Sequence, residues 1–222
     1  MISLPNTGFL ADASDRLKSM MAAQARPVSL SRGQVLFDQG DPGDALFAVT
    51  DGALEVSVLS LQGRKLALDL MGPGAIFGEI SLFDPGPRTA TITATQPSQV
   101  LKVRNADILA QINKHPELAG DMIRLAGLRM RWMGRQLNEQ VFLPVPTRLA
   151  RKLLHLAPVS DSCPKTVALS QSELAEYVGA TREAISKTIA AWKRLGVIET
   201  VRSGILIQDL EALHVLADLE QI

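Results

Sequence analysis

The chain has 222 residues, of which 46% are hydrophobic, and its 23 Lys and Arg residues balance 23 Asp and Glu residues. This length allows one large domain or two small domains, each with its own core. The neutral charge means that nucleic-acid contact would need a local basic surface. The single cysteine, Cys163, excludes a disulfide framework and a cysteine-ligated zinc or iron–sulfur site within one chain. The N-terminus has no secretory pattern, and no run approaches the ~18 apolar residues of a membrane span. These features predict a cytoplasmic protein without a membrane partner.

The first part of the chain predicts a short helix followed by a β-rich unit. Residues 14–25 are rich in helix formers, begin with a serine that can act as N-cap, and stop just before a proline. Across residues 28–103, short β-favouring runs alternate with Gly-, Pro- and Asp-rich turns, apart from an irregular insert before Thr89. This spacing predicts a compact antiparallel roll. In the run Ala53–Leu59, we expect Leu54, Val56 and Val58 to share one face.

A helical pattern follows from Ala106 to Val141, interrupted at Pro116. Its second part carries apolar residues at alternating steps of three and four, the spacing of a coiled-coil seam. We expect this seam to form a homodimer interface, consisting of Ile123, Ala126, Met130, Met133 and Leu137. A second apolar stripe, expected to pack on the helix's own domain, contains Leu118, Met122, Leu125 and Trp132. The alternative, a helix fully buried in a monomer, would bury several arginines at considerable cost.

The segment Phe142–Pro146 contains two prolines that cannot continue this helix. It therefore predicts a hinge over residues 142–146. The expected organisation is an effector-sensing unit over residues 1–115, a dimerisation helix over 116–141, and a C-terminal domain over 147–222.

The C-terminal domain predicts a helix-turn-helix. Ser170 and Glu173 have the spacing of a capping box, and the short helix that follows ends at Gly179. Thr181 can cap a second helix that Gly196 ends. Two short helices joined by a Gly-containing turn are typical of this DNA-binding motif. The residues expected on the buried face of the second helix are Ala184, Ile185, Ile189, Trp192 and Leu195.

The opposite face of the second helix starts with groups that can read base edges. Arg and Lys side chains donate to guanine N7 and O6, and a Glu side chain accepts from cytosine N4. Residues 197–207 predict a hairpin wing with a basic tip, and residues 182–202 hold five basic against two acidic side chains. The candidate DNA contacts are Ser170, Gln171, Thr181, Arg182, Glu183, Ser186, Lys187 and Arg202. An ordinary helical hairpin with solvated charges is the alternative, and a final helix over residues 210–219 has no assigned role beyond packing.

Several motifs in order resemble the catabolite activator/FNR (CRP/FNR) family of bacterial transcription regulators over almost the whole chain. They are Gly33–Asp41, Phe77–Leu82, Pro87–Ala90, Phe142-Leu143 and Thr181–Lys187. The resemblance implies an α+β protein with an N-terminal cyclic-nucleotide-binding β-roll, a long dimerisation helix and a C-terminal winged helix-turn-helix. It also implies a homodimer on near-palindromic double-stranded DNA, with RNA polymerase as a further candidate partner.

The resemblance implies an effector site in the insert of the β-roll. Gly78 and the backbone that follows, including Ile80, would approach the cyclic phosphate, and Glu79 would accept from the ribose 2′-hydroxyl. Arg88 would pair with the phosphate and Thr89 would add a hydroxyl donor, while Arg129 matches a family arginine that supports the pocket acid. Without a ligand, Arg88 and Glu79 would instead have to pair with each other, because buried charges need partners.

The base half of the site departs from the cyclic-AMP pattern. Met133 and Gly134 stand where the cyclic-AMP-responsive activator has hydroxyl residues that contact adenine, and a threonine like Thr89 also occurs in cyclic-GMP-preferring domains. The expected effector is therefore cyclic AMP, then cyclic GMP, with no nucleotide as the third option. No metal, haem or iron–sulfur cofactor is expected, because His115, His155 and His214 all lie outside the roll.

Three other readings of the chain stay open. It can be a family regulator with a non-nucleotide effector, or one that binds DNA without a ligand. It can also be a cyclic-nucleotide-binding regulatory subunit that acts on a protein partner. An enzyme is not expected, because no dinucleotide-binding, P-loop or zinc-protease motif occurs and no catalytic set stands out.

Overall fold

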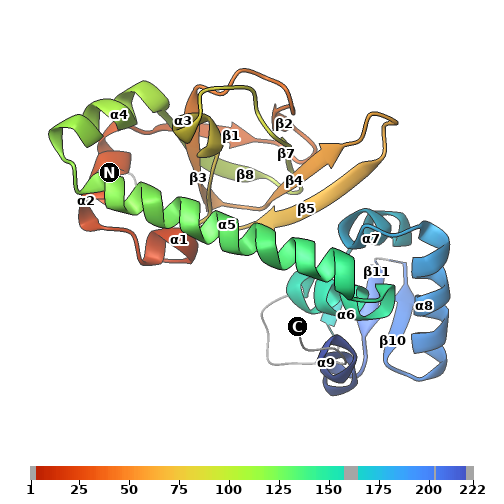
Figure 1. The fold of residues 1–222 in the computed structure, drawn as a ribbon. Coiled ribbons are helices and arrows are strands. Elements are labelled where there is room, and N and C mark those ends of the chain that lie inside the picture. The colour runs from red at the N-terminus through yellow and green to blue at the C-terminus, as the bar shows by residue number, and fades with distance from the viewer. Residues whose placement is uncertain (1–3, 158–164, 203, 219–222) are drawn as a thin grey trace. The chain divides into compact units, whose positions relative to one another are not determined.

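The computed structural model describes residues 4–157, 165–202 and 204–218, which form two compact units (Figure 1). The N-terminal unit is built mainly from residues up to Trp132, and the C-terminal unit mainly from Met133 onwards. Cys163 lies outside the described residues. No helix in the described part of the chain is long and apolar enough to cross a membrane.

The N-terminal unit contains a β-roll of two four-stranded sheets, with the strand orders β1-β8-β3-β6 and β2-β7-β4-β5 (Figure 1). The first sheet consists of β1 (Arg26–Leu30), β8 (Ser98–Arg104), β3 (Ala45–Asp51) and β6 (Ile76–Phe77). The second consists of β2 (Val35–Phe37), β7 (Thr91–Ala94), β4 (Leu54–Leu59) and β5 (Lys65–Met71). The antiparallel pairing of β3 with β8 and of β4 with β7 confirms the predicted roll.

Strand β4 confirms the predicted strand, with Leu54, Val56 and Val58 on one face, but burial is not confined to that face. Leu54 is fully buried, but Val56 and Val58 are only half-buried. Glu55 and Ser57, on the other face, are buried as well. Both faces of this strand are therefore partly covered.

Four helices surround the roll: α1 (Gly8–Ala11), α2 (Asp15–Gln24), α3 (Ile80–Phe83) and α4 (Asn105–Lys114). Ser14 caps α2, since its hydroxyl accepts from the amide of Leu17 at 3.1 Å, as predicted. The same side chain donates to the buried carboxylate of Asp121 at 2.5 Å. The start of the chain is thereby fixed to the first turn of the long helix.

The long helix α5 spans Leu118–Phe142 and begins after the predicted break at Pro116. Leu118, Met122 and Leu125 of the second stripe are buried in a core with α2, and Trp132 is half-buried. The seam residues Ile123, Met130, Met133 and Leu137 have exposed fractions between 53% and 73%, and Ala126 is half-buried. No described residue therefore covers this apolar face of α5.

The C-terminal unit packs four helices on a three-stranded sheet of order β10-β11-β9. Its elements are α6 (Val145–Leu156), β9 (Lys165–Val167), α7 (Gln171–Val178), α8 (Arg182–Arg194), β10 (Ile198–Val201), β11 (Gly204–Ile207) and α9 (Leu210–Asp218). Only Leu143 and Pro144 lie between α5 and α6, because Phe142 still belongs to α5. The segment proposed as a hinge is thus mostly helical.

Local rules account for the helix-turn-helix. In the capping box, Glu173 accepts from the Ser170 amide at 2.7 Å, and the Ser170 hydroxyl accepts from the Glu173 amide at 3.2 Å. Gly179 ends α7 with φ +67°, and Thr181 accepts from the Ala184 amide at 3.2 Å.

The expected buried face of α8 is confirmed at Ile185, Ile189 and Trp192. Leu195 is 71% exposed, so its assignment to that face was wrong. Leu195 is the C-cap that follows Arg194, the last residue of α8, so it lies beyond the part of the helix that packs on the core.

Candidate functional site

The first candidate site is the insert between β6 and β7, and it begins at Gly78. This glycine has φ +84°, and a Cβ built on it would lie 2.8 Å from the carbonyl oxygen of Ala45 and 2.9 Å from Arg88 Nη1. Any other residue would be strained by both the backbone angle and the contact. Glycine therefore allows the chain to pass directly beside the guanidinium of Arg88 before α3 starts.

Arg88 is 5% exposed and is held from one side of its guanidinium. Nη1 donates to the carbonyl oxygens of Ala45 at 2.9 Å and Gly78 at 3.4 Å, and to the Ser81 hydroxyl at 3.2 Å. The guanidinium carbon lies 4.3 Å from the ring centroid of Phe37, which covers the charge with an aromatic face.

The other edge of the guanidinium lacks such partners. Nε is buried, and no described residue accepts a hydrogen bond from it. Nη2 lies 3.7 Å from Asp44 Oδ1, beyond hydrogen-bond distance. Burial lowers the pKa of Arg88, and the carboxylates of Asp44, Asp41 and Glu79 oppose that shift. A buried donor without a partner costs about 1–3 kcal/mol, so this edge is an energetically favourable place for an anion.

Glu79 precedes α3 and is almost fully buried, with 2% of its surface exposed. Its partner is Arg129 of α5, whose Nε donates to Glu79 Oε1 at 2.7 Å. Arg129 Nη2 also donates to the Ile76 carbonyl at 3.3 Å, and its guanidinium lies 5.5 Å from the Trp132 ring. The ion pair of Glu79 is therefore with Arg129, and the alternative pairing with Arg88 was wrong.

The remaining predicted effector residues are more exposed than Arg88 and Glu79. Ile80 is the first residue of α3 and is 40% exposed. Thr89 follows Arg88 and is exposed. Met133 and Gly134 lie about one turn beyond Arg129 on α5, in the C-terminal unit, and both are exposed.

Three residues of this site were missed by the sequence reasoning: Ser81, Asn105 and Asp44. The Ser81 hydroxyl donates to the Gly78 carbonyl at 3.0 Å while accepting from Arg88, and Asn105 donates to the Ser81 carbonyl at 3.1 Å. Ser81 lies inside the motif Phe77–Leu82, which was a usable signal. Asp44 gave no comparable signal, because only the fold brings it near Arg88.

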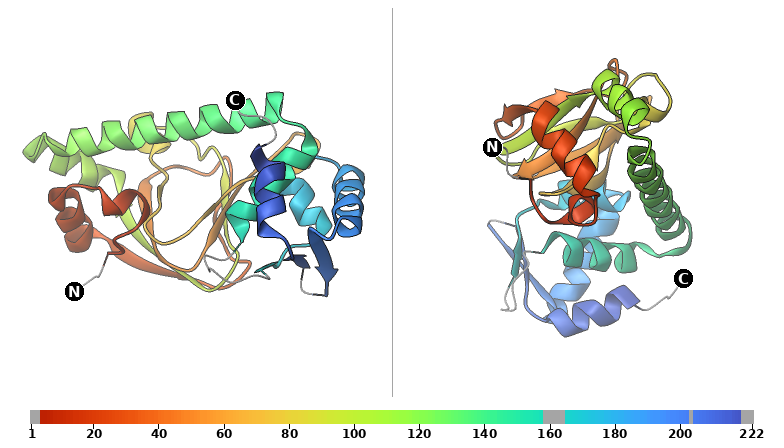
Figure 2. Two further views of the ribbon diagram at one scale, coloured as in Figure 1. Left: turned by 90° about the horizontal axis from the view of Figure 1, so that it is seen from below. Right: turned by 90° about the vertical axis from the view of Figure 1, so that its left-hand side faces the viewer.

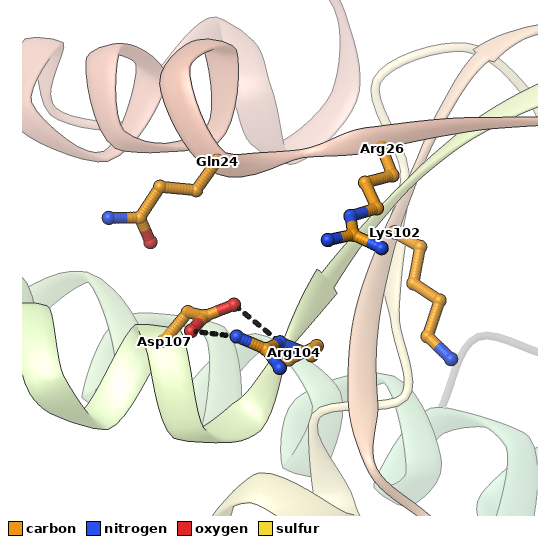
Figure 3. A pocket seen from close by; sticks show the side chains of 5 residues that line it. All are labelled: Gln24, Arg26, Lys102, Arg104 and Asp107. Atoms are coloured by element: carbon orange, nitrogen blue, oxygen red, sulfur yellow. Dashed lines mark hydrogen bonds and ion pairs between the residues drawn. The ribbon is translucent and has the colours of Figure 1, made fainter.

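A separate hollow of about 140 Å³ lies elsewhere on the N-terminal unit (Figure 3). Arg26 and Lys102 come from paired positions on β1 and β8, and Arg104 donates twice to Asp107 at 2.8 Å. Gln24 of α2 completes the lining. Figure 3 shows three cationic side chains around this hollow against one carboxylate.

The second candidate site is the outer face of α8. Figures 1 and 2 place α8 at the edge of the C-terminal unit, with the hairpin β10–β11 beside it. The four predicted base-reading residues on α8, all exposed, are Arg182, Glu183, Ser186 and Lys187. The other candidates are exposed except for the half-buried Gln171: Ser170, Thr181 and, between β10 and β11, Arg202.

The exposed cations of this surface have no acidic partner in the part of the chain that the structure describes. Within the described part of the chain, Arg182, Lys187 and Arg202 take part in no recorded ion pair. Lys193, farther along α8, donates to the Thr200 hydroxyl at 2.7 Å and so ties the helix to the hairpin. The surface formed by α8 and the hairpin is therefore a fixed, positively charged unit that suits the major groove and its phosphates.

The two units match two different family models. Residues 27–115 match the cyclic nucleotide-binding domain, and residues 147–216 match the Crp-like helix-turn-helix domain. No group of three or more His, Cys, Asp or Glu side chains that could hold a metal ion occurs among the described residues.

Similar proteins agree with both matches. The chain is 31% identical over 215 residues to the CRP-like cAMP-activated global transcriptional regulator of Mycobacterium tuberculosis, covering 95% of this chain and 96% of that protein. It is 31% identical over 185 residues to the cyclic AMP receptor protein of Thermus thermophilus, covering 81% and 85%. A crystal structure of a CRP/FNR-family transcriptional regulator from the same organism superposes with a TM-score of 0.74 at 26% identity, covering 87% of this chain and 98% of that one. The chain therefore belongs to the CRP/FNR family of DNA-binding transcription regulators.

Proposed function

We propose that this protein is a homodimeric, sequence-specific regulator whose DNA affinity is controlled by a cyclic nucleotide. The observation that carries the proposal is the buried edge of Arg88, where Nε has no partner and Nη2 has only a distant carboxylate. The two exocyclic oxygens of a cyclic phosphate match a guanidinium edge and would accept both hydrogen bonds. The same anion would offset the cost of burying the charge.

Two further residues support a ribose next to this phosphate. Glu79 is buried beside Gly78, and Arg129 fixes its orientation through the 2.7 Å contact to Oε1. A carboxylate fixed in this way can accept from the 2′-hydroxyl of a ribose. We therefore assign effector contacts to Gly78, Glu79, Ile80, Arg88 and Thr89, with Arg129 as their support.

Cyclic AMP is the effector that we propose first. Two relatives at 31% identity are named as cAMP-activated and as a cyclic AMP receptor. The exposed hydroxyl of Thr89 and the absence of hydroxyls at Met133 and Gly134 keep cyclic GMP as the competing effector. We therefore propose that Thr89, Met133 and Gly134 are the positions that decide between the two bases.

The uncovered seam of α5 supports a dimer. Four large apolar side chains on one face of a helix are expected to pack against a partner, and a second copy of α5 has the same spacing. A two-fold dimer would place its two α8 helices about 34 Å apart, one DNA turn, on a near-palindromic site. Effector binding would then shift α5 between two states of different DNA affinity, by as much as its affinity for those states differs.

RNA polymerase is the further partner that we propose for the DNA-bound dimer. The cationic hollow in Figure 3 suits an acidic segment of such a protein, because Arg26 and Lys102 lie side by side there while Asp107 is paired with Arg104. Lys102 also donates to Asp44 Oδ2 at 3.3 Å, so Arg26 is the main cation offered to a partner. Replacing Arg26 and Lys102 by Glu should lower transcription from a bound promoter without lowering DNA affinity. Equal transcription by this variant would exclude the hollow as a contact.

The test combines two titrations on the full chain. Calorimetry with cyclic AMP and cyclic GMP measures effector affinity, and duplexes selected from a random library with and without each nucleotide measure DNA binding. We expect micromolar or tighter binding of one nucleotide and stronger DNA binding in its presence.

Each contrary outcome identifies a different function. DNA binding that no nucleotide changes would show a ligand-independent regulator, or one with another effector. Nucleotide binding without any DNA binding would show a regulatory subunit that acts on a protein partner.

A further inference from the structure

The last turn of α5 makes a direct contact with the turn of the helix-turn-helix, and both belong to the C-terminal unit. Gln140 Nε2 donates to the carbonyl oxygen of Val178 at 3.2 Å. Val178 is the last residue of α7, where carbonyl groups lack partners within the helix. Gln140 thus supplies a donor at the point where the chain turns towards α8.

Gly179 makes this approach close. A Cβ built on Gly179 would lie 2.9 Å from Gln140 Nε2 and 3.0 Å from Gln140 Oε1. The glycine is needed for its φ of +67°, and its missing side chain also lets the amide of Gln140 lie directly on the turn. The contact therefore needs both the amide of Gln140 and the absence of a side chain at Gly179.

The other end of the same amide is also engaged. Gln140 Oε1 accepts from Arg148 Nη1 of α6. Burial lowers the pKa of Arg148, and the carboxylate of Glu139 opposes this shift. Glu139 in turn contacts Arg151 Nη1 at 3.3 Å. One glutamine side chain thereby joins the end of α5, the start of α6 and the turn before α8.

We propose that Gln140 is a positioning residue that makes the orientation of α8 follow the state of α5. The covalent route from α5 to α8 runs through all of α6, β9 and α7, whereas Gln140 reaches the turn before α8 directly. Any rotation of the last turn of α5 would move Val178 and Gly179 with it. This inference rests on the proposed function, because it names the residue that carries the effector signal to the DNA-reading helix.

The test compares Gln140→Glu, Gln140→Ala and the control Asn138→Ala, whose site is exposed on the same helical turn. Glu has the size of Gln and can still accept from Arg148, but it cannot donate to the Val178 carbonyl. Calorimetry gives effector affinity without DNA, and fluorescence anisotropy on a selected duplex gives DNA affinity with and without cyclic nucleotide. Thermal unfolding shows whether each variant is folded.

We expect both Gln140 variants to bind the effector as the wild type does. Their DNA affinity with effector should fall about 2- to 10-fold, as for one lost hydrogen bond, while DNA affinity without effector changes less. Asn138→Ala should resemble the wild type in every measurement. In Gln140→Glu, the gain in DNA affinity on adding effector should be smaller than in the wild type. Its melting temperature should stay the same, because Glu can still accept from Arg148.

Three outcomes would overturn the proposal. Normal coupling in Gln140→Glu would show that the donor to Val178 is not needed. Equal losses of DNA affinity with and without effector would show that Gln140 only stabilises the helix-turn-helix. If the wild type itself shows no response to any cyclic nucleotide, the proposed function fails, and the coupling that Gln140 is meant to carry fails with it.

Discussion

The effector site buries its charged side chains, whereas the DNA-reading face exposes them. In the effector site, Arg88 and Glu79 are at most 5% exposed, and Arg129 holds the carboxylate. On α8, Arg182 and Lys187 are exposed and take part in no recorded ion pair among the described residues. A buried charge is costly without a matched partner, whereas an exposed cation costs little and attracts any polyanion.

This difference teaches how the two sites select their ligands. The buried site selects by geometry, since only an anion that fits the edge of Arg88 repays its desolvation. The exposed face gains general affinity from phosphate charge and sequence preference from a few base contacts. Effector binding should therefore respond weakly to salt, and DNA binding strongly, because salt screens exposed charges far more than buried ones.

Removing the charge from the buried site should have the largest effect. We expect Arg88→Ala to weaken cyclic-nucleotide binding at least about 100-fold, because two charge-assisted hydrogen bonds are worth roughly 3–6 kcal/mol together. Calorimetry measures the loss. The matched control is Arg104→Ala, an arginine whose side chain is 63% exposed and pairs with Asp107 outside the insert. Similar losses in both variants would show a general effect of charge and contradict the assignment of Arg88.

The second largest effect that we expect is a loss of unfolding free energy when the glycine beside Arg88 is replaced. Gly78 and Gly63 both have positive φ, +84° and +76°, but a Cβ on Gly63 would meet nothing within 4 Å. Gly63→Ala should therefore cost only the backbone strain, about 1–2 kcal/mol of unfolding free energy. Gly78→Ala adds the contacts with Ala45 and Arg88 and should cost roughly 3 kcal/mol or more. Urea unfolding compares the two, and equal costs would mean that the insert relaxes without strain.

The parts of the fold that follow local rules were predictable from the sequence. The capping box at Ser170, the left-handed turn at Gly179 and the cap at Thr181 each depend on residues within three positions of one another. The antiparallel roll was predictable from its turn spacing, but the burial of β4 was not. Burial of Glu55 and Ser57 depends on what packs against the second face of the sheet, which the alternation along one strand does not reveal.

The candidate sites divide in the same way. The exposed face of α8 was predictable, because helical periodicity separates Lys187 from Ile185 and Ile189. The partner of Glu79 lies 50 positions away on α5, and only the resemblance to a family indicated Arg129. The approach of Asp44 to Arg88 depends on how β3 and the insert meet in the roll, and no local pattern encodes it.

The base-reading face should give a third, smaller effect, and one that depends on sequence. We expect Lys187→Ala to cost about 1–3 kcal/mol of DNA affinity and to relax the preference at one base position, because the side chain would donate to a guanine edge. Selection from a random duplex library shows the preference, and anisotropy gives the affinity. A loss that is the same on every sequence would instead make Lys187 a phosphate contact.

The tip of the hairpin should give the smallest effect, and one that depends on salt and not on sequence. Arg202 lies exposed between β10 and β11. We expect it to contact the DNA backbone beside the groove that α8 would enter. We expect Arg202→Ala to lower the slope of log affinity against log salt by about 0.9, as for one lost phosphate contact. The selected sequence should stay the same, since a phosphate carries no base identity. Anisotropy titrations at several salt concentrations measure the slope, and an unchanged slope with an altered sequence preference would move Arg202 to the base-reading group. Compared with Arg88→Ala, this variant would show that salt weakens the DNA contact of an exposed arginine. The effector contact of the buried arginine should be much less sensitive to salt.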